Sequence, residues 1–298
     1  MTQTKWIGGL TDWTEGNTAF LSVVFSWQLP QAYQRAVWLK MQGYHVRAGG
    51  PAVSLHPYYL IDVAEIGGEV DALPYHNPNA TFTSRGCIRR CPFCAVPRIE
   101  GDLIELEDWE PKPIVCDNNL LACSRKHFDR VIDRLKPIKG VDFNQGLDAR
   151  LLTKYHTGRL AELDLRMVRL AWDDVQFESQ VASAIEKLRK ALIPVKKIRV
   201  YVLFGFQDTP EDALYRMRTL KKEWGIDPLP MRLQKMAINR AFEIMGLNEA
   251  LKAASDLDVL IEGVETPDSK TFAEIANKEG LKAALKWRDS RFATDDES

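Results

Sequence analysis

Cysteine is scarce in this chain, and it has neither long apolar runs nor an excess of charge of one sign. Its 298 residues include five cysteines, and 40 basic residues are balanced by 41 acidic ones. No stretch approaches the length of a membrane span, and the N-terminus lacks a basic region followed by an apolar run. We therefore expect a cytoplasmic protein with no membrane partner. The balanced charge also provides no global basic surface of the kind typical of nucleic-acid binders.

Internal repeats and low-complexity segments are absent as well. The length is sufficient for one large domain or two smaller ones with a sizeable core. Three of the five cysteines lie together between residues 87 and 94. In an intracellular chain, such clustering indicates metal binding or redox chemistry rather than a disulfide framework.

Cys87, Cys91 and Cys94 have the spacing Cys-x3-Cys-x2-Cys on one short loop. Soft sulfur ligands select iron–sulfur clusters, zinc or Cu(I). Structural zinc and most iron–sulfur clusters take four protein ligands, but the other two cysteines lie far downstream. A 4Fe-4S cube held by three thiolates leaves one iron open to the amine and carboxylate of a small molecule. A zinc knuckle is the alternative, and His76 is the only close histidine.

This spacing, with Phe93 before the last cysteine, resembles the signature of the radical S-adenosylmethionine (SAM) superfamily. Residues 95–101 resemble the loop that follows the cluster in its methylthiotransferase-like and cobalamin-associated branches. The resemblance implies a 4Fe-4S cluster on the three cysteines, SAM on the open iron, and a flavodoxin or ferredoxin as electron donor. Reductive cleavage of SAM would give methionine and a 5′-deoxyadenosyl radical, which abstracts a hydrogen atom from an unidentified substrate. Such an enzyme is an oxidoreductase or a transferase.

Strand and helix patterns alternate from about residue 77 onward, which predicts an α/β fold of parallel β/α units. Repeated units curl toward a barrel whose chemistry lies at the carboxyl ends of its strands. Six strands fit the partial (β/α)6 TIM-like barrel that the resemblance implies. The strands are expected at 80–83, 113–116, 140–144, 167–171, 198–204 and 231–236, and the helices at 125–135, 151–163, 176–191 and 210–224.

The N-terminal segment predicts a small Rossmann-like βαβ unit. Residues 19–27 are an apolar, β-branched run, Pro30 opens a helical pattern, and residues 44–51 form a short strand that enters a glycine turn. The unit is similar to part of the cobalamin-binding domain of radical SAM relatives, but it is short and lacks their cobalt-ligating histidine motif.

We therefore expect three parts, namely a reduced Rossmann-like cap over 1–75, the barrel over 76–240 and a helical C-terminal extension over 241–298.

The strand ends provide the side chains that the resemblance assigns to SAM. Asp117 or Asn118, after the second strand, would bind the methionine amine, although Asx helix caps explain them equally well. Arg150, after the third strand, would bind the carboxylate bidentately, with Gln145 and Asp148 facing the same cavity. A salt bridge within the barrel is the alternative for Arg150.

The later strand ends add further candidates. Asp173, in preference to Asp174, would lie near the ribose. Phe204 and Gly205 would lie beside the adenine, where glycine permits close backbone approach, although Thr209 also makes an ordinary N-cap for the helix that follows.

The sixth strand would direct Arg232, Gln234 or Met236 at the cavity, and alternation alone does not choose between them. Met236 is retained as the SAM contact. Cys116, at a strand end, is a radical quencher, a substrate tether, an extra ligand or a buried apolar thiol, and Cys123 is expected to be structural.

Three classes of function compete. The first is a radical SAM enzyme without cobalamin that acts on a small molecule, nucleotide or peptide. The second is a cobalamin-dependent radical methyltransferase or an RNA- or nucleotide-modifying methylthiotransferase-like enzyme. The arginines at 85, 89, 90 and 98 beside the cluster support RNA modification, and their alternative role is to stabilise the anionic cluster and cap loops. The third is a non-enzymatic zinc or Fe–S binding module. We prefer the first, with cobalamin as the lesser alternative.

Overall fold

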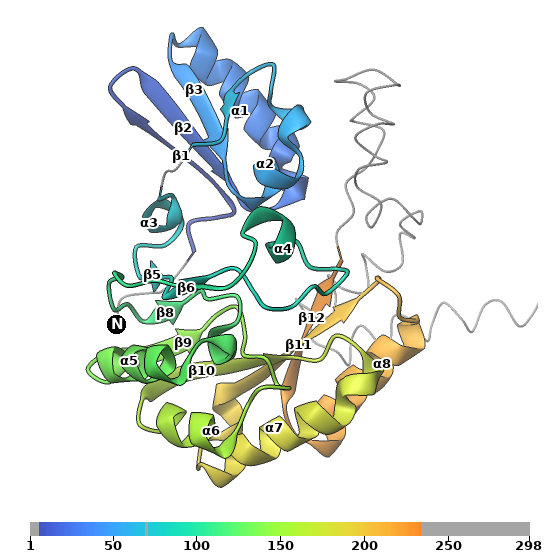
Figure 1. The fold of residues 1–298 in the computed structure, drawn as a ribbon. Helices are drawn as coiled ribbons and strands as arrows, with labels where there is room; N and C mark the ends of the chain where they lie inside the picture. The colour runs from blue at the N-terminus through green and yellow to red at the C-terminus, as the bar shows by residue number, and fades with distance from the viewer. Residues whose placement is uncertain (1–5, 69–70, 234–298) are drawn as a thin grey trace, which may run out of the picture. The chain divides into compact units, whose positions relative to one another are not determined.

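The structure, a computed structural model, describes residues 6–68 and 71–233 in two compact units (Figure 1). The first unit comprises 6–81, without 69–70, and 89–102. The second comprises 82–88 and 103–233. One boundary lies inside the cysteine loop, so that Cys87 belongs to the second unit and Cys91 and Cys94 to the first. Met236 and the predicted extension over 241–298 lie outside the described residues.

The first unit is built on a four-stranded sheet of order β1-β2-β3-β4. Strands β2 (Thr18–Val23), β3 (His45–Gly49) and β4 (Glu65–Ile66) are parallel. Helix α1 (Leu29–Met41) connects β2 to β3, which confirms the predicted βαβ unit. Apolar side chains of β2 and α1 form much of the core of the first unit; they include Ala19, Leu21, Val23, Leu29, Ala32, Ala36 and Leu39.

Strand β1 (Leu10–Glu15) was not predicted. It pairs antiparallel with β2 through the two-residue loop at Gly16 and Asn17. Gly16 has a φ of +59°, as the favoured two-residue hairpin turns require. The remaining elements of this unit are η1 (Ser26–Gln28), α2 (Pro51–Leu55), η2 (Pro57–Tyr59), α3 (Leu73–His76), β5 (Ala80–Thr81) and α4 (Val96–Ile99).

The second unit contains five parallel strands in the order β12-β11-β10-β9-β8, which makes it an α/β unit with a mostly parallel sheet. The strands are β8 (Ile114–Val115), β9 (Lys139–Phe143), β10 (Asp164–Ala171), β11 (Ile198–Phe204) and β12 (Asp227–Arg232). Helices α5 (Arg125–Leu135), α6 (Lys154–Leu160), α7 (Glu178–Lys190) and α8 (Pro210–Arg218) connect consecutive strands, as predicted. Several bounds differ from the expected ones. Strand β12 begins four residues before Met231 and β10 three residues before Met167, while α6 is three residues shorter at each end and α8 ends at Arg218.

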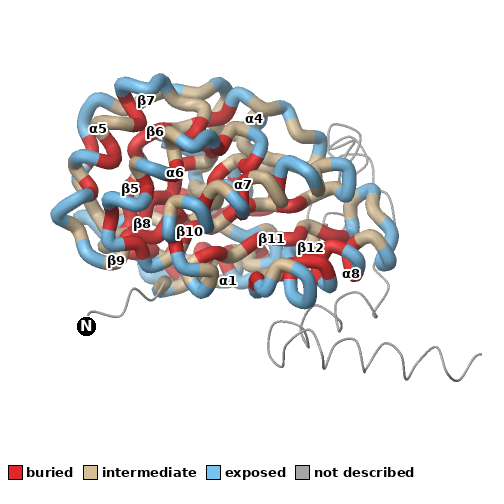
Figure 2. The backbone as a smooth tube through the Cα atoms, turned by 90° about the horizontal axis from the view of Figure 1, so that it is seen from below, coloured by how far each residue is buried: buried red, intermediate tan, exposed pale blue. Residues whose placement is uncertain are grey.

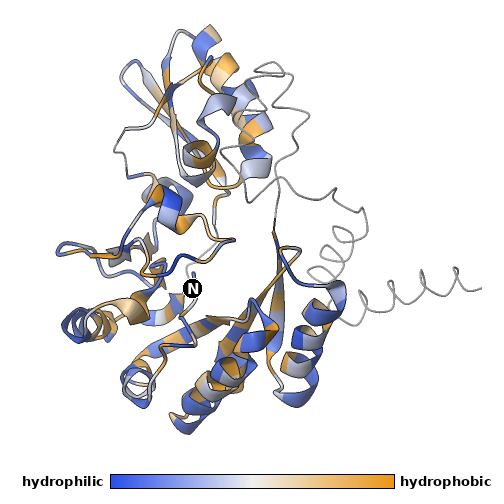
Figure 3. Ribbon diagram, turned by 45° about the vertical axis from the view of Figure 1, so that its right-hand side comes forward, coloured by the Kyte–Doolittle hydropathy of each residue, from blue (hydrophilic) through white to orange (hydrophobic). Residues whose placement is uncertain are grey.

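The sheet of the second unit has one apolar and one polar face. Helices α5 to α8 lie on the same side of it (Figure 1), and alternate residues of β11 from Ile198 to Phe204 are buried in the core. Figure 2 shows buried residues concentrated along the strands, and Figure 3 shows helices that carry both apolar and polar residues. On the other face Arg169 donates to both carboxylate oxygens of Asp142, at 2.9 and 2.6 Å, and to the Tyr201 hydroxyl at 2.8 Å.

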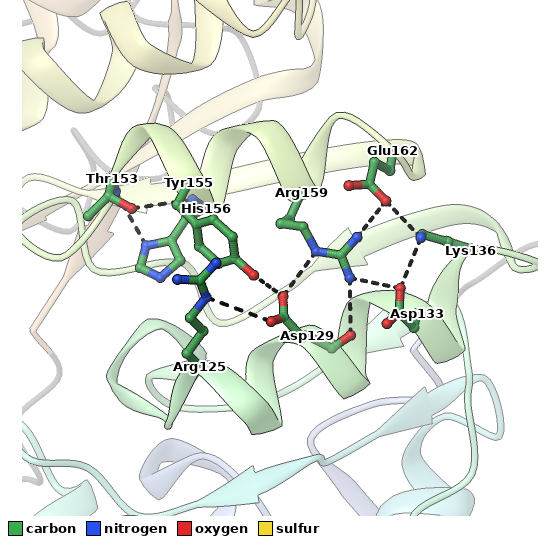
Figure 4. Close-up of polar contacts among 9 residues, drawn as sticks. All are labelled: Arg125, Asp129, Asp133, Lys136, Thr153, Tyr155, His156, Arg159 and Glu162. Carbon is green, nitrogen blue, oxygen red and sulfur yellow. Dashed lines mark hydrogen bonds and ion pairs between the residues drawn. The ribbon is translucent and has the colours of Figure 1, made fainter.

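Helices α5 and α6 are joined at the surface by ion pairs (Figure 4). The Arg159 guanidinium lies 3.0 Å from Asp129, 2.7 Å from Asp133 and 2.5 Å from Glu162. The smaller elements of the unit are β6 (Ser84–Arg85), β7 (Ile104–Glu105), η3 (Leu120–Ala122), η4 (Val175–Phe177), η5 (Val195–Lys197) and the π-helical turn η6 (Thr219–Glu223). No helix in the described ranges has both the length and the apolar character needed to cross a bilayer.

Candidate functional site

A buried polar cluster anchors the chain where it enters the cysteine loop. The Thr83 backbone N–H donates to Asp117 at 2.6 Å, and the Thr83 hydroxyl donates to the same carboxylate. The Thr83 hydroxyl oxygen also lies 3.2 Å from Nε2 of His127. All three residues are buried, and burial raises the pKa of Asp117 and lowers that of His127. Asp117 therefore contacts the backbone just before the loop, and in the part of the chain that the structure describes it caps no helix.

Cys87 lies beside the carboxyl end of β8 in the second unit. Asn119 follows that strand, and its amide Nδ2 is 3.5 Å from the Cys87 Sγ and 3.4 Å from Oδ2 of Asp148. Asn119 is 3 % exposed and Cys87 is 8 % exposed. One buried amide thus joins the first cysteine of the loop to a carboxylate that follows β9.

Asp148 forms a bidentate salt bridge with Arg150. Nε of Arg150 donates to Oδ1 at 2.7 Å and Nη2 donates to Oδ2 at 3.1 Å. The Arg150 guanidinium also lies 5.0 Å from the ring centroid of Phe177. This is the salt bridge that the sequence offers as the alternative role of Arg150. Gln145, in the same loop, is exposed.

Asp173, after β10, is a second strand-end carboxylate whose pKa is raised. Burial raises its pKa to about 6, while the charges of Arg216 and Arg150 act in the opposite direction. An acid with that pKa can exchange a proton near neutral pH. Because the charges of Arg150 and Asp148 both act on the pKa of Asp173, this carboxylate lies within electrostatic range of the Asp148–Arg150 pair.

The loop after β11 is held by the fully buried Arg216 of α8. Its guanidinium donates to the Trp172 carbonyl at 2.7 Å and pairs with Asp208. Asp208 in turn accepts from the Gly205 backbone N–H at 2.9 Å. Gly205 has a φ of +81°, which explains the glycine without any ligand.

The fifth strand end also carries two other predicted residues. Thr209 caps α8 in a reciprocal pair with Asp212, as predicted. The Phe204 side chain packs in the core of the unit.

Cys91 and Cys94 lie in one turn of the first unit. The Cys94 backbone N–H donates to the Cys91 carbonyl at 2.9 Å, and half-buried Phe93 lies within the turn. Residues 95–101, expected as a loop, contain α4. Neither cysteine is in a disulfide.

Cys116 and Cys123 are the two cysteines outside the loop, and neither is in a disulfide. Burial raises the pKa of both Cys116 and Cys123 to about 12. With no metal bound, both thiols are therefore protonated at neutral pH. The three loop cysteines are candidate donors for a metal cluster by their sequence spacing. Among residues 6–68 and 71–233, no three His, Cys, Asp or Glu side chains form a group that could hold a metal ion.

The structure brings Asp148, Arg150 and Asp173 together and adds two residues that the sequence did not single out, Asn119 and Arg216. Asn119 had a signal, because it is the third polar residue of the run that includes Asp117. Arg216 had none, because its partner carbonyl is 44 residues away in the chain.

Compared with known proteins, the sequence matches no protein-family model and no curated relative. The assignment of a function therefore depends on these side chains.

Proposed function

We propose that this chain is a radical SAM enzyme that cleaves SAM reductively and abstracts a hydrogen atom from a substrate. The observation that carries the proposal is the contact between Cys87 and Asn119 at the strand ends. Through Asn119 it connects the first thiol of the three-cysteine loop to Asp148, which is paired with Arg150. A parallel α/β sheet binds its ligands at this edge, where polar side chains from several strands converge.

Cys87, Cys91 and Cys94 would hold a 4Fe-4S cluster. When bound, the cluster supplies a one-electron reduction of the SAM sulfonium that yields methionine and a 5′-deoxyadenosyl radical. The electron comes from a flavodoxin or ferredoxin. We also propose that the sheet and its helices form a partial (β/α)6 barrel, that the first unit is a reduced Rossmann-like cap, and that the enzyme is cytoplasmic.

The strand-end side chains would bind and orient SAM. Arg150, held in place by Asp148, presents positive charge for the SAM carboxylate, and Asn118 lies at the adjacent strand end. Asp173, ionised above a pKa of about 6, accepts hydrogen bonds from the ribose hydroxyls. The buried cluster of Thr83, Asp117 and His127 keeps the entry of the cysteine loop in position.

The test is anaerobic reconstitution with iron and sulfide, followed by addition of SAM and dithionite. The wild-type chain is expected to hold about four iron atoms and to release 5′-deoxyadenosine and methionine in equal amounts. Alanine at Cys87, Cys91 or Cys94 abolishes both iron loading and SAM cleavage. Cys123→Ala is the matched control and retains both.

Two results would overturn the proposal. One is a chain that holds a single zinc ion and no iron. The other is a chain that holds the cluster but releases no 5′-deoxyadenosine.

A further inference from the structure

We propose that Asn119 is a positioning residue that raises the reduction potential of the cluster by donating a hydrogen bond from Nδ2 to the Cys87 sulfur. This inference rests on the proposed function, because it concerns the cluster that the loop cysteines would hold. It assigns a specific task to a side chain that the sequence does not distinguish from its two polar neighbours.

The orientation of the Asn119 amide follows from Asp148. A carboxylate accepts hydrogen bonds and donates none when ionised, so the side-chain group 3.4 Å from Oδ2 of Asp148 must be the NH₂. An amide NH₂ has two hydrogens. The second is available to the Cys87 Sγ at 3.5 Å, a normal distance for a hydrogen bond to sulfur.

Asp148 is itself fixed. Its side chain is 6 % exposed and both of its carboxylate oxygens accept hydrogen bonds from Arg150. The pair of Asp148 and Arg150 thus acts on the sulfur through Asn119, and none of the three needs to touch the metal.

The amide oxygen of Asn119 indicates that the contacts of Nδ2 with Cys87 and Asp148 determine the position of the side chain. The Asn119 Oδ1 is buried and has no hydrogen-bond partner among the described residues. Native structures leave few buried polar atoms in that state. The side chain therefore keeps its place at the cost of an unsatisfied acceptor, which is expected if its NH₂ group is the functional end.

The physical effect on a cluster is direct. Reduction adds negative charge that is shared with the ligating sulfurs, and a hydrogen bond donated to a sulfur stabilises that charge. Burial of both residues strengthens the bond, because little water competes for it. Removal of the donor should therefore make the cluster harder to reduce.

The test is the midpoint potential of the reconstituted cluster, measured in an anaerobic redox titration followed by electron paramagnetic resonance. Asn119→Leu keeps the size of the side chain and the net charge but removes the donor. At the wild-type midpoint potential, the ratio of reduced to oxidised cluster is expected to fall about tenfold in this variant. Asn119→Ser, too short to reach the sulfur, gives the same direction of shift and serves if the leucine variant does not fold.

Asn144→Ser is the matched control, since Asn144 follows β9 in the same unit and its side chain makes no described contact with Cys87. Its midpoint is expected to equal that of the wild type. A wild-type midpoint in both Asn119 variants overturns the role of Asn119 and leaves the proposed function intact. A wild-type chain that takes up no iron overturns the proposed function itself, and the inference with it.

Discussion

Arg216 is expected to be one of the most costly residues to replace in the second unit. Its guanidinium is fully buried and connects the ends of two strands. It donates to the Trp172 carbonyl, directly before Asp173, and it pairs with Asp208 in the loop after β11. The substitution Arg216→Met keeps most of the side-chain volume and removes the charge and the donors.

The magnitude follows from what is left unpaired. Removal of one partner of a buried ion pair costs about 3–5 kcal/mol, because the other charge stays buried. The Asp208 side chain is 13 % exposed and keeps two backbone donors, Gly205 at 2.9 Å and Phe206 at 3.3 Å. These contacts favour the lower end of the range. We therefore expect Arg216→Met to lower the free energy of unfolding by about 3 kcal/mol.

The assay is equilibrium urea unfolding followed by far-ultraviolet circular dichroism. Arg218→Met on the same helix is the control, because Arg218 is exposed and its loss should cost at most about 0.5 kcal/mol. The double variant Arg216→Met with Asp208→Asn is expected to be more stable than Arg216→Met alone, since no charge is left unpaired. A loss below about 1 kcal/mol for Arg216→Met would refute the reasoning.

Two further predictions concern pH and salt. Because the folded-state pKa of Asp173, about 6, lies above its usual value, its stabilising contribution is full at acid pH and is lost as the pH rises through 6. The gain in the urea midpoint from about pH 8 to about pH 5 should be smaller in Asp173→Asn, and equal gains would contradict this. Arg159→Met should lower the thermal midpoint at low ionic strength, because it removes the ion pairs with Asp129 and its neighbours (Figure 4). The difference should shrink in concentrated NaCl, and a salt-independent difference would point to lost packing instead.

The elements that sequence patterns predicted well are those whose signal is local. The observed bounds of α5, Arg125–Leu135, equal the predicted ones, and Ser124 accepts a hydrogen bond from the His127 backbone as its N-cap. Strand β11 alternates between buried and partly buried residues over its whole length. Alternating apolar residues and a helix N-cap are both recognised from residues that are neighbours in sequence, so no tertiary information is needed to predict them.

The displaced strand β12 shows where such signals mislead. It contains Pro228 and Pro230, which disfavour a strand inside a sheet. The sheet order places β12 beside β11 alone, at an edge, where prolines are tolerated. Position in the sheet is a tertiary property, and local propensity could not provide it.

The candidate site was predicted in its residue types more than in its contacts. Asp117 or Asn118 was predicted to bind a ligand amine, and the structure shows Asp117 bound to Thr83, 34 residues earlier in the chain. Asn119, two residues later, reaches the cysteine loop. Neighbours in one polar run point to different partners because each side chain leaves a turning backbone in a different direction, and the sequence records only that all three are polar.

The separate contacts of Asp117 and Asn119 indicate how a short cysteine loop acquires a defined geometry. A loop of eight residues is too small to bury a core of its own, so its conformation must be set by the structure around it. In the second unit, two residues that follow β8 contact the start of the loop. Asp117 fixes the backbone at Thr83, before the loop, and Asn119 contacts the side chain of its first cysteine. If both contacts act together, loss of the Thr83 anchor should change the environment of Cys87 even though Asn119 is intact. Asp117→Leu, which removes the acceptor of both Thr83 hydrogen bonds, should then shift the cluster midpoint in the same direction as Asn119→Leu, and independent contacts would leave it unchanged.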